Sequence, residues 1–140
     1  MFDELSKYKN TDHFFVSANN SLEDVCNAPK DRGGVILVYE LKNGGIQLVY
    51  IGSACKVNRN GRLGKTSLYD TILNGHQFGE LPRKKTWLNK IKVENIDALD
   101  VYWYVTFNSE TADIPSYVAA TIIQRFFDFN GCFPRWNTEM

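Results

Sequence analysis

Two tyrosines and a basic segment are the parts of this sequence whose residue types and spacing could do chemistry. Tyr39 and Tyr50 lie eleven positions apart, near the ends of two apolar runs that flank an Asn43-Gly44 turn. The segment between Leu41 and Val93 carries ten basic and two acidic residues, a local charge of +8 in a chain of zero formal net charge. Such asymmetry can give a neutral protein a positive face, whose natural ligand is a polyanion. The alternative is a solvated, helix-rich middle segment.

Three strands and three helices are expected to position these side chains. The two apolar runs predict a β-hairpin over residues 34–41 and 46–52, and the polar stretch from 53 to 64 predicts an exposed basic loop. Helices are expected over 65–74, ending at Gly75, and from about Pro82. Residues 100–107 alternate as a third strand, and a long helix should begin at Ile114-Pro115. The fold class is therefore α+β, with a small, mostly antiparallel three-stranded sheet flanked by helices.

Length and composition predict one compact domain, because 140 residues of which 44% are hydrophobic can build a substantial core. Residues 1–33 are expected to form an irregular or short-helical N-terminal extension or cover, and residues 34–140 the domain itself. Three cysteines without a CxxC pair predict free thiols. No apolar run approaches the roughly 18 residues of a membrane span, so we expect a soluble, cytoplasmic protein without a membrane partner.

The second strand ends in Tyr50-Ile51-Gly52, and at this point the chain resembles the GIY-YIG nuclease superfamily. Its members pair a first strand ending in tyrosine with a second strand ending in Tyr-Ile-Gly; here the first triplet has become Leu37-Val38-Tyr39. They also finish with an apolar helix and a Pro-x-aromatic-Asn element, similar to Phe133-Pro-Arg-Trp-Asn137. The resemblance covers about residues 34–137, and it implies a DNA endonuclease of the restriction or phage type.

The resemblance also implies catalytic roles. A tyrosine of the YIG element activates the attacking water, which carries over to Tyr50, with Tyr39 expected beside it as an orienting partner. An arginine shortly after YIG grips the scissile phosphate, because a guanidinium matches phosphate oxygens in two-pronged geometry. Arg62 is the first choice for this grip. The further candidates are Lys65, which could share the role of Arg62, together with Tyr69, His76 and Asn137.

Five basic residues are candidates for binding the DNA backbone rather than for chemistry. Two lie in the loop after the second strand, and three form a cluster after Pro82 that could equally be an exposed basic turn over the core residue Trp87. Asn137 has a comparable structural alternative, a C-terminal turn cap. The five residues are Lys56, Arg59, Arg83, Lys84 and Lys85.

The last helix lacks the residue that the resemblance leads one to expect. In the family, one glutamate on this helix holds a divalent metal, Mg²⁺ or Mn²⁺, that stabilises the leaving group. The helix here contains no glutamate, and placing its apolar pair on Ile122-Ile123 puts the metal ligand at Ala119. Ala119 shares a helical face with this pair and should point toward the sheet, leaving an empty pocket.

We therefore expect a metal-dependent DNA endonuclease that is inactive as written, acting on double-stranded DNA. Two explanations of Ala119 stay open: a natural, catalytically inactive DNA-binding module of the same fold, or a glutamate-to-alanine substitution in an otherwise intact nuclease. A homodimer would be needed to cut both strands. The recognition sequence cannot be read from the chain, because base contacts depend on groove geometry.

Overall fold

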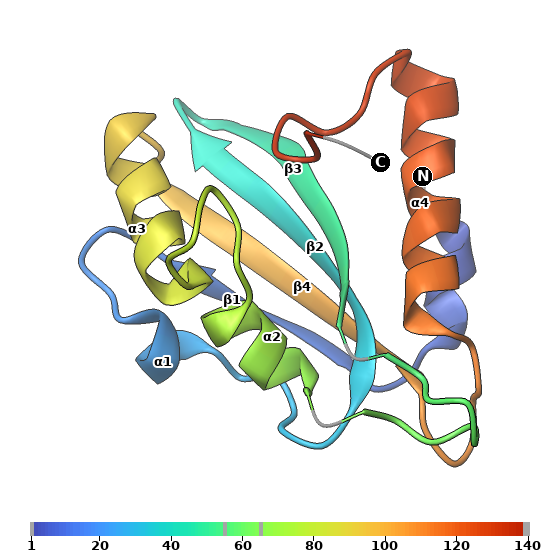
Figure 1. Ribbon diagram of the computed structural model, residues 1–140. Helices are drawn as coiled ribbons and strands as arrows, with labels where there is room; N and C mark the ends of the chain where they lie inside the picture. The colour runs from blue at the N-terminus through green and yellow to red at the C-terminus, as the bar shows by residue number, and fades with distance from the viewer. Residues whose placement is uncertain (1, 55, 65, 139–140) are drawn as a thin grey trace.

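The protein is described here from a computed structural model, which covers residues 2–54, 56–64 and 66–138. An antiparallel sheet of four strands lies at its centre, in the order β1-β4-β2-β3 (Figure 1). The strands are β1 (Thr11–Val16), β2 (Gly33–Lys42), β3 (Gly45–Ala54) and β4 (Ala98–Phe107). The α+β class is confirmed, but the sheet has four strands where the sequence predicted three.

The added strand comes from the segment that was expected to be an irregular or short-helical cover. β1 pairs with β4, with Phe14 opposite Val101, so residues 11–16 extend the sheet itself. Only its second half alternates between buried and exposed side chains, with Phe14 and Val16 buried. Its first half, Thr11-Asp12-His13, is polar and exposed or half-buried, which hides the period-two pattern of a strand.

The β2–β3 hairpin forms where the sequence predicts it. Asn43 and Gly44 both have positive φ values, 54° and 78°, as a two-residue turn between twisted antiparallel strands requires. A β-bulge between Val38 and Tyr39 shifts the register, so that Val38 lies opposite Tyr50 and Tyr39 opposite Leu48. Because of this shift, Val38 and Tyr50 share one face of the sheet, and Tyr39 and Leu48 share the other.

The helices divide between the two faces of the sheet (Figure 1). One face is covered by α1 (Leu22–Val25), α2 (Leu68–Asn74) and α3 (Arg83–Val93), and the other by the 3₁₀ helix η1 (Asp3–Lys7) and α4 (Pro115–Asn130). The end of α2 at Gly75, the start of α3 after Pro82 and the start of α4 at Pro115 agree with the predictions, and other helix ends are set by local signals that the sequence analysis did not use. Ser67 caps the backbone N–H of Asp70, α3 follows Pro82, and α4 ends at Gly131 with φ 73°.

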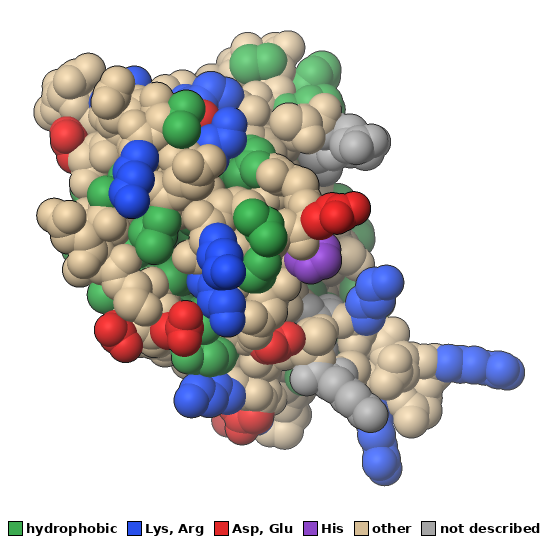
Figure 2. Space-filling model, turned by 60° about the vertical axis from the view of Figure 1, so that its left-hand side comes forward, with side chains coloured by type: hydrophobic (Ala, Val, Ile, Leu, Met, Phe, Trp, Pro, Cys, Tyr) green, Lys and Arg blue, Asp and Glu red, His purple; other side chains and the backbone are tan. Residues whose placement is uncertain are grey.

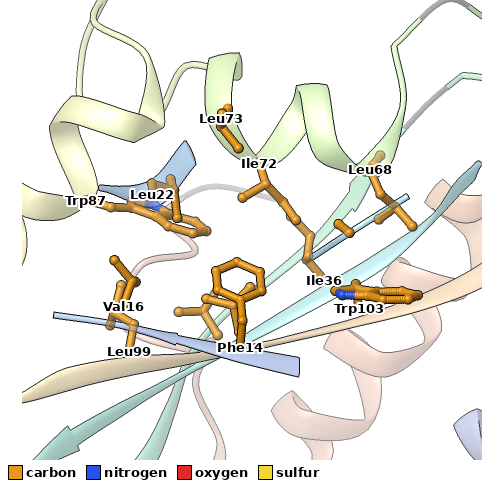
Figure 3. Close-up of a cluster of buried hydrophobic side chains, with 14 of the residues drawn as sticks. Phe14, Val16, Leu22, Ile36, Leu68, Ile72, Leu73, Trp87, Leu99 and Trp103 are labelled. Atoms are coloured by element: carbon orange, nitrogen blue, oxygen red, sulfur yellow. The ribbon is translucent and has the colours of Figure 1, made fainter. Parts of the chain in front are cut away.

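Each face has its own hydrophobic cluster. On the first face Phe14, Ile36, Ile72 and Trp87 pack between the sheet and helices α1 to α3 (Figure 3). The second cluster packs the inner side of α4 and Leu5 of η1 against β2 and β3, with Ile122 and Ile123 buried. Because β3 is the edge strand, both clusters reach the same free edge of the sheet.

The C-terminal segment closes part of that edge. The Trp136 backbone N–H donates to the Val49 carbonyl at 2.8 Å. The Asn137 side chain then replaces a strand partner, because its Oδ1 accepts from the Ile51 N–H and its Nδ2 donates to the Ile51 carbonyl, each at 2.9 Å. These contacts fix the segment beside Tyr50-Ile51-Gly52.

Candidate functional site

A hollow of about 460 Å³ lies at the edge of β3, between α4 and the loop that joins α2 to α3. We call it the arginine hollow. Its wall combines residues from the end of β3, the α2–α3 loop, the first turn of α3, the inner side of α4 and the C-terminal segment. Five residues that the sequence singled out line it together: Tyr50, His76, Arg83, Ala119 and Asn137.

Arg83 is the most tightly held of these side chains. Only 6% of its surface is exposed, and three of its nitrogens donate hydrogen bonds. Nε donates to Gln77 Oε1 at 2.9 Å, Nη1 to the Thr71 carbonyl at 2.6 Å, and Nη2 to the Tyr50 hydroxyl at 3.1 Å. The guanidinium also lies 5.5 Å from the centre of the Tyr50 ring. Arg83 is thereby fixed in one position against Tyr50.

The charge of Arg83 has no acidic partner among the described residues. All three acceptors are neutral, and its guanidinium forms no salt bridge there. A buried cation costs several kcal/mol of desolvation unless an opposite charge or hydrogen bonds compensate it. A positive group held in this way beside an open hollow can bind an anion. The geometry of a guanidinium matches the oxygens of a phosphate.

Two glycines make room for this arrangement. A Cβ at Gly75 would collide with the Arg83 guanidinium and the Thr71 carbonyl, so only glycine lets Arg83 reach back past the end of α2. A Cβ at Gly52 would lie 2.6 Å from the Tyr50 ring. The last residue of Tyr50-Ile51-Gly52 therefore lets the ring of its first residue lie flat over the strand.

Gln77 connects the arginine to the core. Its Oε1 accepts from both Arg83 Nε and Trp87 Nε1, each at 2.9 Å, which fixes the orientation of the amide. Its Nε2 is buried and has no hydrogen-bond partner in the described part of the chain, and the same holds for Nε1 of Trp136, a residue that also lines the hollow. Buried donors without acceptors are costly and rare in native proteins. Both atoms are themselves inaccessible to solvent, so the wall of the hollow contains unsatisfied donors that a ligand in the hollow does not reach directly.

The prediction that Tyr39 lies beside Tyr50 is wrong, because the two side chains lie on opposite faces of the sheet. Tyr50 packs against the cluster under α2 and α3, and Tyr39 against the cluster under α4. The bulge at Val38 and Tyr39 causes the separation. Burial, then the neighbouring Tyr104, Tyr102 and Asp100, raise the pKa of Tyr39 to about 12, so its phenol stays protonated near neutral pH.

Arg62 and Tyr69 are also outside the arginine hollow. Arg62 is exposed on the loop after β3, where its backbone carbonyl accepts from the Asn58 N–H at 2.8 Å. The Tyr69 ring lies 4.7 Å from Lys30 Nζ, against the N-terminal part of the chain. Of the two arginines, Arg83 therefore lies beside Tyr50, and Arg62 does not line the same hollow. Lys65 lies outside the described residues.

The remaining predicted residues lie partly at the arginine hollow and partly on the exposed surface. His76 is exposed at the rim of the hollow, in a loop closed by the Arg83 N–H donating to the Gly75 carbonyl at 2.9 Å. Asn137 has the hydrogen-bonding position at β3 described above. On α3, Lys84 is half-buried and Lys85 is exposed. Lys56 and Arg59 are exposed, together with Arg62, on the loop after β3. Figure 2 shows basic side chains spread over the face of the molecule that α1 to α3 cover.

Ala119 lies where the sequence predicts, on the inner side of α4. It is 5% exposed, belongs to the cluster with Ile122 and Ile123, and lines the arginine hollow. No carboxylate lines this hollow among the described residues, and no group of three or more His, Cys, Asp or Glu side chains there could hold a metal ion. Because Mg²⁺ prefers carboxylate and other oxygen ligands, the present side chains do not fit it.

Sequence reasoning placed Arg83 in a surface cluster and missed Gln77 altogether. One signal for Arg83 was present: Arg83-Lys84-Lys85 occupies the first turn of α3, where no acidic residue lies. The helix dipole disfavours cations at this end, so such a placement indicates a role other than helix stability. Gln77 lies in a loop and carries no comparable signal.

Comparisons of the chain with protein-family models, with curated proteins and with solved structures found no match. Among the described residues, no helix has the length and apolar character needed to cross a membrane.

Proposed function

We propose that the protein binds duplex DNA, with a backbone phosphate in the arginine hollow, and that its phosphodiester site is of the GIY-YIG type but lacks its metal-binding carboxylate. The observation that carries this proposal is the buried Arg83 guanidinium, which is held against Tyr50 without an acidic partner among the described residues. A guanidinium in this position can grip two oxygens of a phosphate.

The remaining groups of the hollow support the same ligand. Tyr50 accepts a hydrogen bond from Arg83, so its own hydroxyl proton is free to point toward a phosphate oxygen or an attacking water. His76 at the rim can add a further hydrogen bond. Two elements favour the GIY-YIG comparison: a hairpin that ends in Tyr50-Ile51-Gly52, and a C-terminal asparagine that ties the same strand.

The side chains that line the arginine hollow do not supply every group that phosphodiester hydrolysis needs. Hydrolysis needs an activated water, a phosphate grip and stabilisation of the leaving oxygen. Tyr50 and Arg83 supply candidates for the first two. The third has no candidate, because Ala119 occupies the position facing the hollow where a carboxylate could bind a cation. The chain is therefore proposed to bind DNA without cleaving it.

Ala119→Glu tests whether this is a nuclease site or a binding site only. A glutamate at 119 would extend into the arginine hollow, and we expect the variant to gain Mg²⁺-dependent cleavage of duplex DNA that the wild type lacks. Gln124→Glu, exposed on the same helix and outside the lining of the arginine hollow, is the control and should gain no activity. Cleavage is measured on a labelled duplex with Mg²⁺ and with EDTA.

Binding is measured alongside, by fluorescence anisotropy at about 50 mM and about 200 mM salt, because phosphate contacts must weaken steeply with salt. If Ala119→Glu binds duplex DNA and still does not cleave it, the protein is a DNA-binding module and not a disabled nuclease. Absence of salt-dependent binding by the wild type would overturn the whole proposal.

A further inference from the structure

We propose that residues 56–64, which we call the basic hairpin, hold the DNA backbone next to the phosphate in the arginine hollow. The inference rests on the proposed function and gives Arg62 a role different from the catalytic grip that the sequence predicts. The hairpin follows β3 directly and projects beside the start of α4 (Figure 1).

The basic hairpin is closed by its own backbone. Val57 and Leu63 form an antiparallel bridge, the Asn58 N–H donates to the Arg62 carbonyl at 2.8 Å, and the Gly64 N–H donates to the Lys56 carbonyl at 2.7 Å. Its tip turns at Gly61, whose φ is 79°. A hairpin held in this way presents its side chains in a fixed direction before any ligand binds, which lowers the entropy cost of binding.

The two arginines of the hairpin face solvent. Arg59 and Arg62 are exposed, and neither forms a salt bridge with any described residue. The sequence from Ser53 to Thr66 contains no aspartate or glutamate, so no acidic residue within the segment offsets their charge. Figure 2 shows basic side chains extending from a projecting part of the surface. Exposed arginines without acidic neighbours are well suited to phosphate contacts.

A second hollow, of about 860 Å³, connects the hairpin to the arginine hollow. Lys56, Asn58 and Gly64 of the hairpin line it together with Ile114 and Ser116 at the start of α4. Ser53 and Ser116 line both hollows, so the two are neighbours along the end of β3.

The lining of the second hollow fits a sugar–phosphate backbone. Beside the apolar Val57 and Ile114, it holds serine, threonine and asparagine side chains and one lysine, and no acidic side chain from the described residues. Such groups make most protein contacts to DNA phosphates and sugars, and they fix the position of the duplex without reading its sequence. Thr71, whose carbonyl holds Arg83, also lines this hollow and joins the two structurally. A DNA strand that leaves the arginine hollow and follows β3 would reach the basic hairpin.

The double variant Arg59→Gln/Arg62→Gln tests the assignment. Each phosphate contact contributes about 0.9 to the slope of log affinity against log salt, so loss of two contacts should lower the slope by roughly 2. Between about 50 mM and about 200 mM salt, the wild type should then lose about ten-fold more affinity than the double variant. Both arginines are exposed, so the thermal unfolding temperature should stay unchanged.

Lys9→Gln/Lys92→Gln is the matched control, because it removes the same charge at two exposed positions outside the hairpin. Its salt slope should stay within about 0.5 of the wild-type value. Equal slopes for the arginine double variant and the wild type, or an equal decrease in the lysine control, would overturn the role of the hairpin while leaving the proposed function standing. If the wild type shows no salt-dependent DNA binding, both proposals fail together.

Discussion

The two tyrosines of the β2–β3 hairpin lie in opposite surroundings. Tyr50 faces an open hollow and accepts a hydrogen bond from Arg83, a cation without a carboxylate partner among the described residues. Tyr39, on the other face, packs in a T-shaped contact with Tyr102, near Asp100. Cations stabilise a phenolate or an anionic ligand, whereas burial beside a carboxylate opposes both. The sequence spacing makes the two tyrosines look equivalent, but their charged neighbours separate them.

The polar side chains around Asp100, on the other face of the sheet, contact one another. Asp100 is 8% exposed and its Oδ1 lies 2.7 Å from His13 Nδ1, and the His13 ring stacks on Tyr102 with centroids 4.6 Å apart. The Asp100 carboxylate thus has a ring nitrogen within hydrogen-bonding distance. The arginine hollow differs because the Arg83 guanidinium has no acidic partner among the described residues, which is why we place the ligand there.

The largest expected effect comes from comparing an unpaired arginine with a paired one. Arg83→Gln should weaken duplex binding by about 30-fold, since hydrogen bonds to charged groups contribute about 2 kcal/mol each. Arg135 instead pairs with Glu40 at 2.8 Å and Glu94 at 2.6 Å. Arg135→Gln should leave DNA affinity within about two-fold and lower the unfolding free energy by about 1 to 2 kcal/mol, because Glu40 is buried and Arg135 partly exposed.

Anisotropy titrations and urea denaturation of both variants measure this contrast. A similar loss of affinity in the two variants would mean that DNA responds to total charge rather than to the arginine hollow.

A smaller effect is expected from removing single hydroxyl groups. Tyr50→Phe leaves Arg83 Nη2 without its acceptor and removes a donor from the hollow, so duplex affinity should fall by about five-fold. Tyr39→Phe changes nothing in the hollow and should bind DNA like the wild type. In an Ala119→Glu background, only Tyr50→Phe should abolish cleavage. A loss of cleavage in Tyr39→Phe would show that the sheet transmits an effect across its faces, contrary to the separation argued above.

A separate effect is expected on alkaline stability rather than on DNA binding. The pKa of Tyr39 is raised to about 12, so its contribution to stability is complete below about pH 10, the unfolded value, and is lost as pH rises through 12. Tyr39→Phe should therefore lose about 2 kcal/mol less unfolding free energy than the wild type over that interval. Tyr117→Phe, at a position 70% exposed, is the control and should follow the wild type. Denaturant titrations at several pH values would reveal the difference, and identical pH profiles for Tyr39→Phe and the wild type would contradict it.

Local signals predicted much of the fold. The Asn43-Gly44 turn, the start of α3 after Pro82 and the start of α4 at Pro115 each depend on the conformational preferences of one or two residues. The strand β1 was missed because its pairing partner lies about 90 residues away and its own alternation covers only its second half. Pairing between distant segments leaves little trace in a short window of sequence.

The candidate site was predicted in part for the same reason. Tyr50, Ala119 and Asn137 lie where element order and helical spacing put them. The bulge that separates Tyr39 from Tyr50 is a single-residue register shift that the sequence does not mark. Arg83 reaches the hollow only because the loop after α2 folds back on Gly75, a tertiary feature that no linear spacing reveals.

The most direct test of the phosphate site is to observe the Arg83 side chain itself. Arginine Nε–H signals in a ¹⁵N-labelled protein can be assigned with Arg83→Gln and Arg135→Gln and followed while a short duplex is added. We expect the Arg83 signal to shift with the binding isotherm of the DNA, while the Arg135 signal, held by two carboxylates, stays in place. An unshifted Arg83 signal at saturating DNA would contradict a phosphate in the arginine hollow.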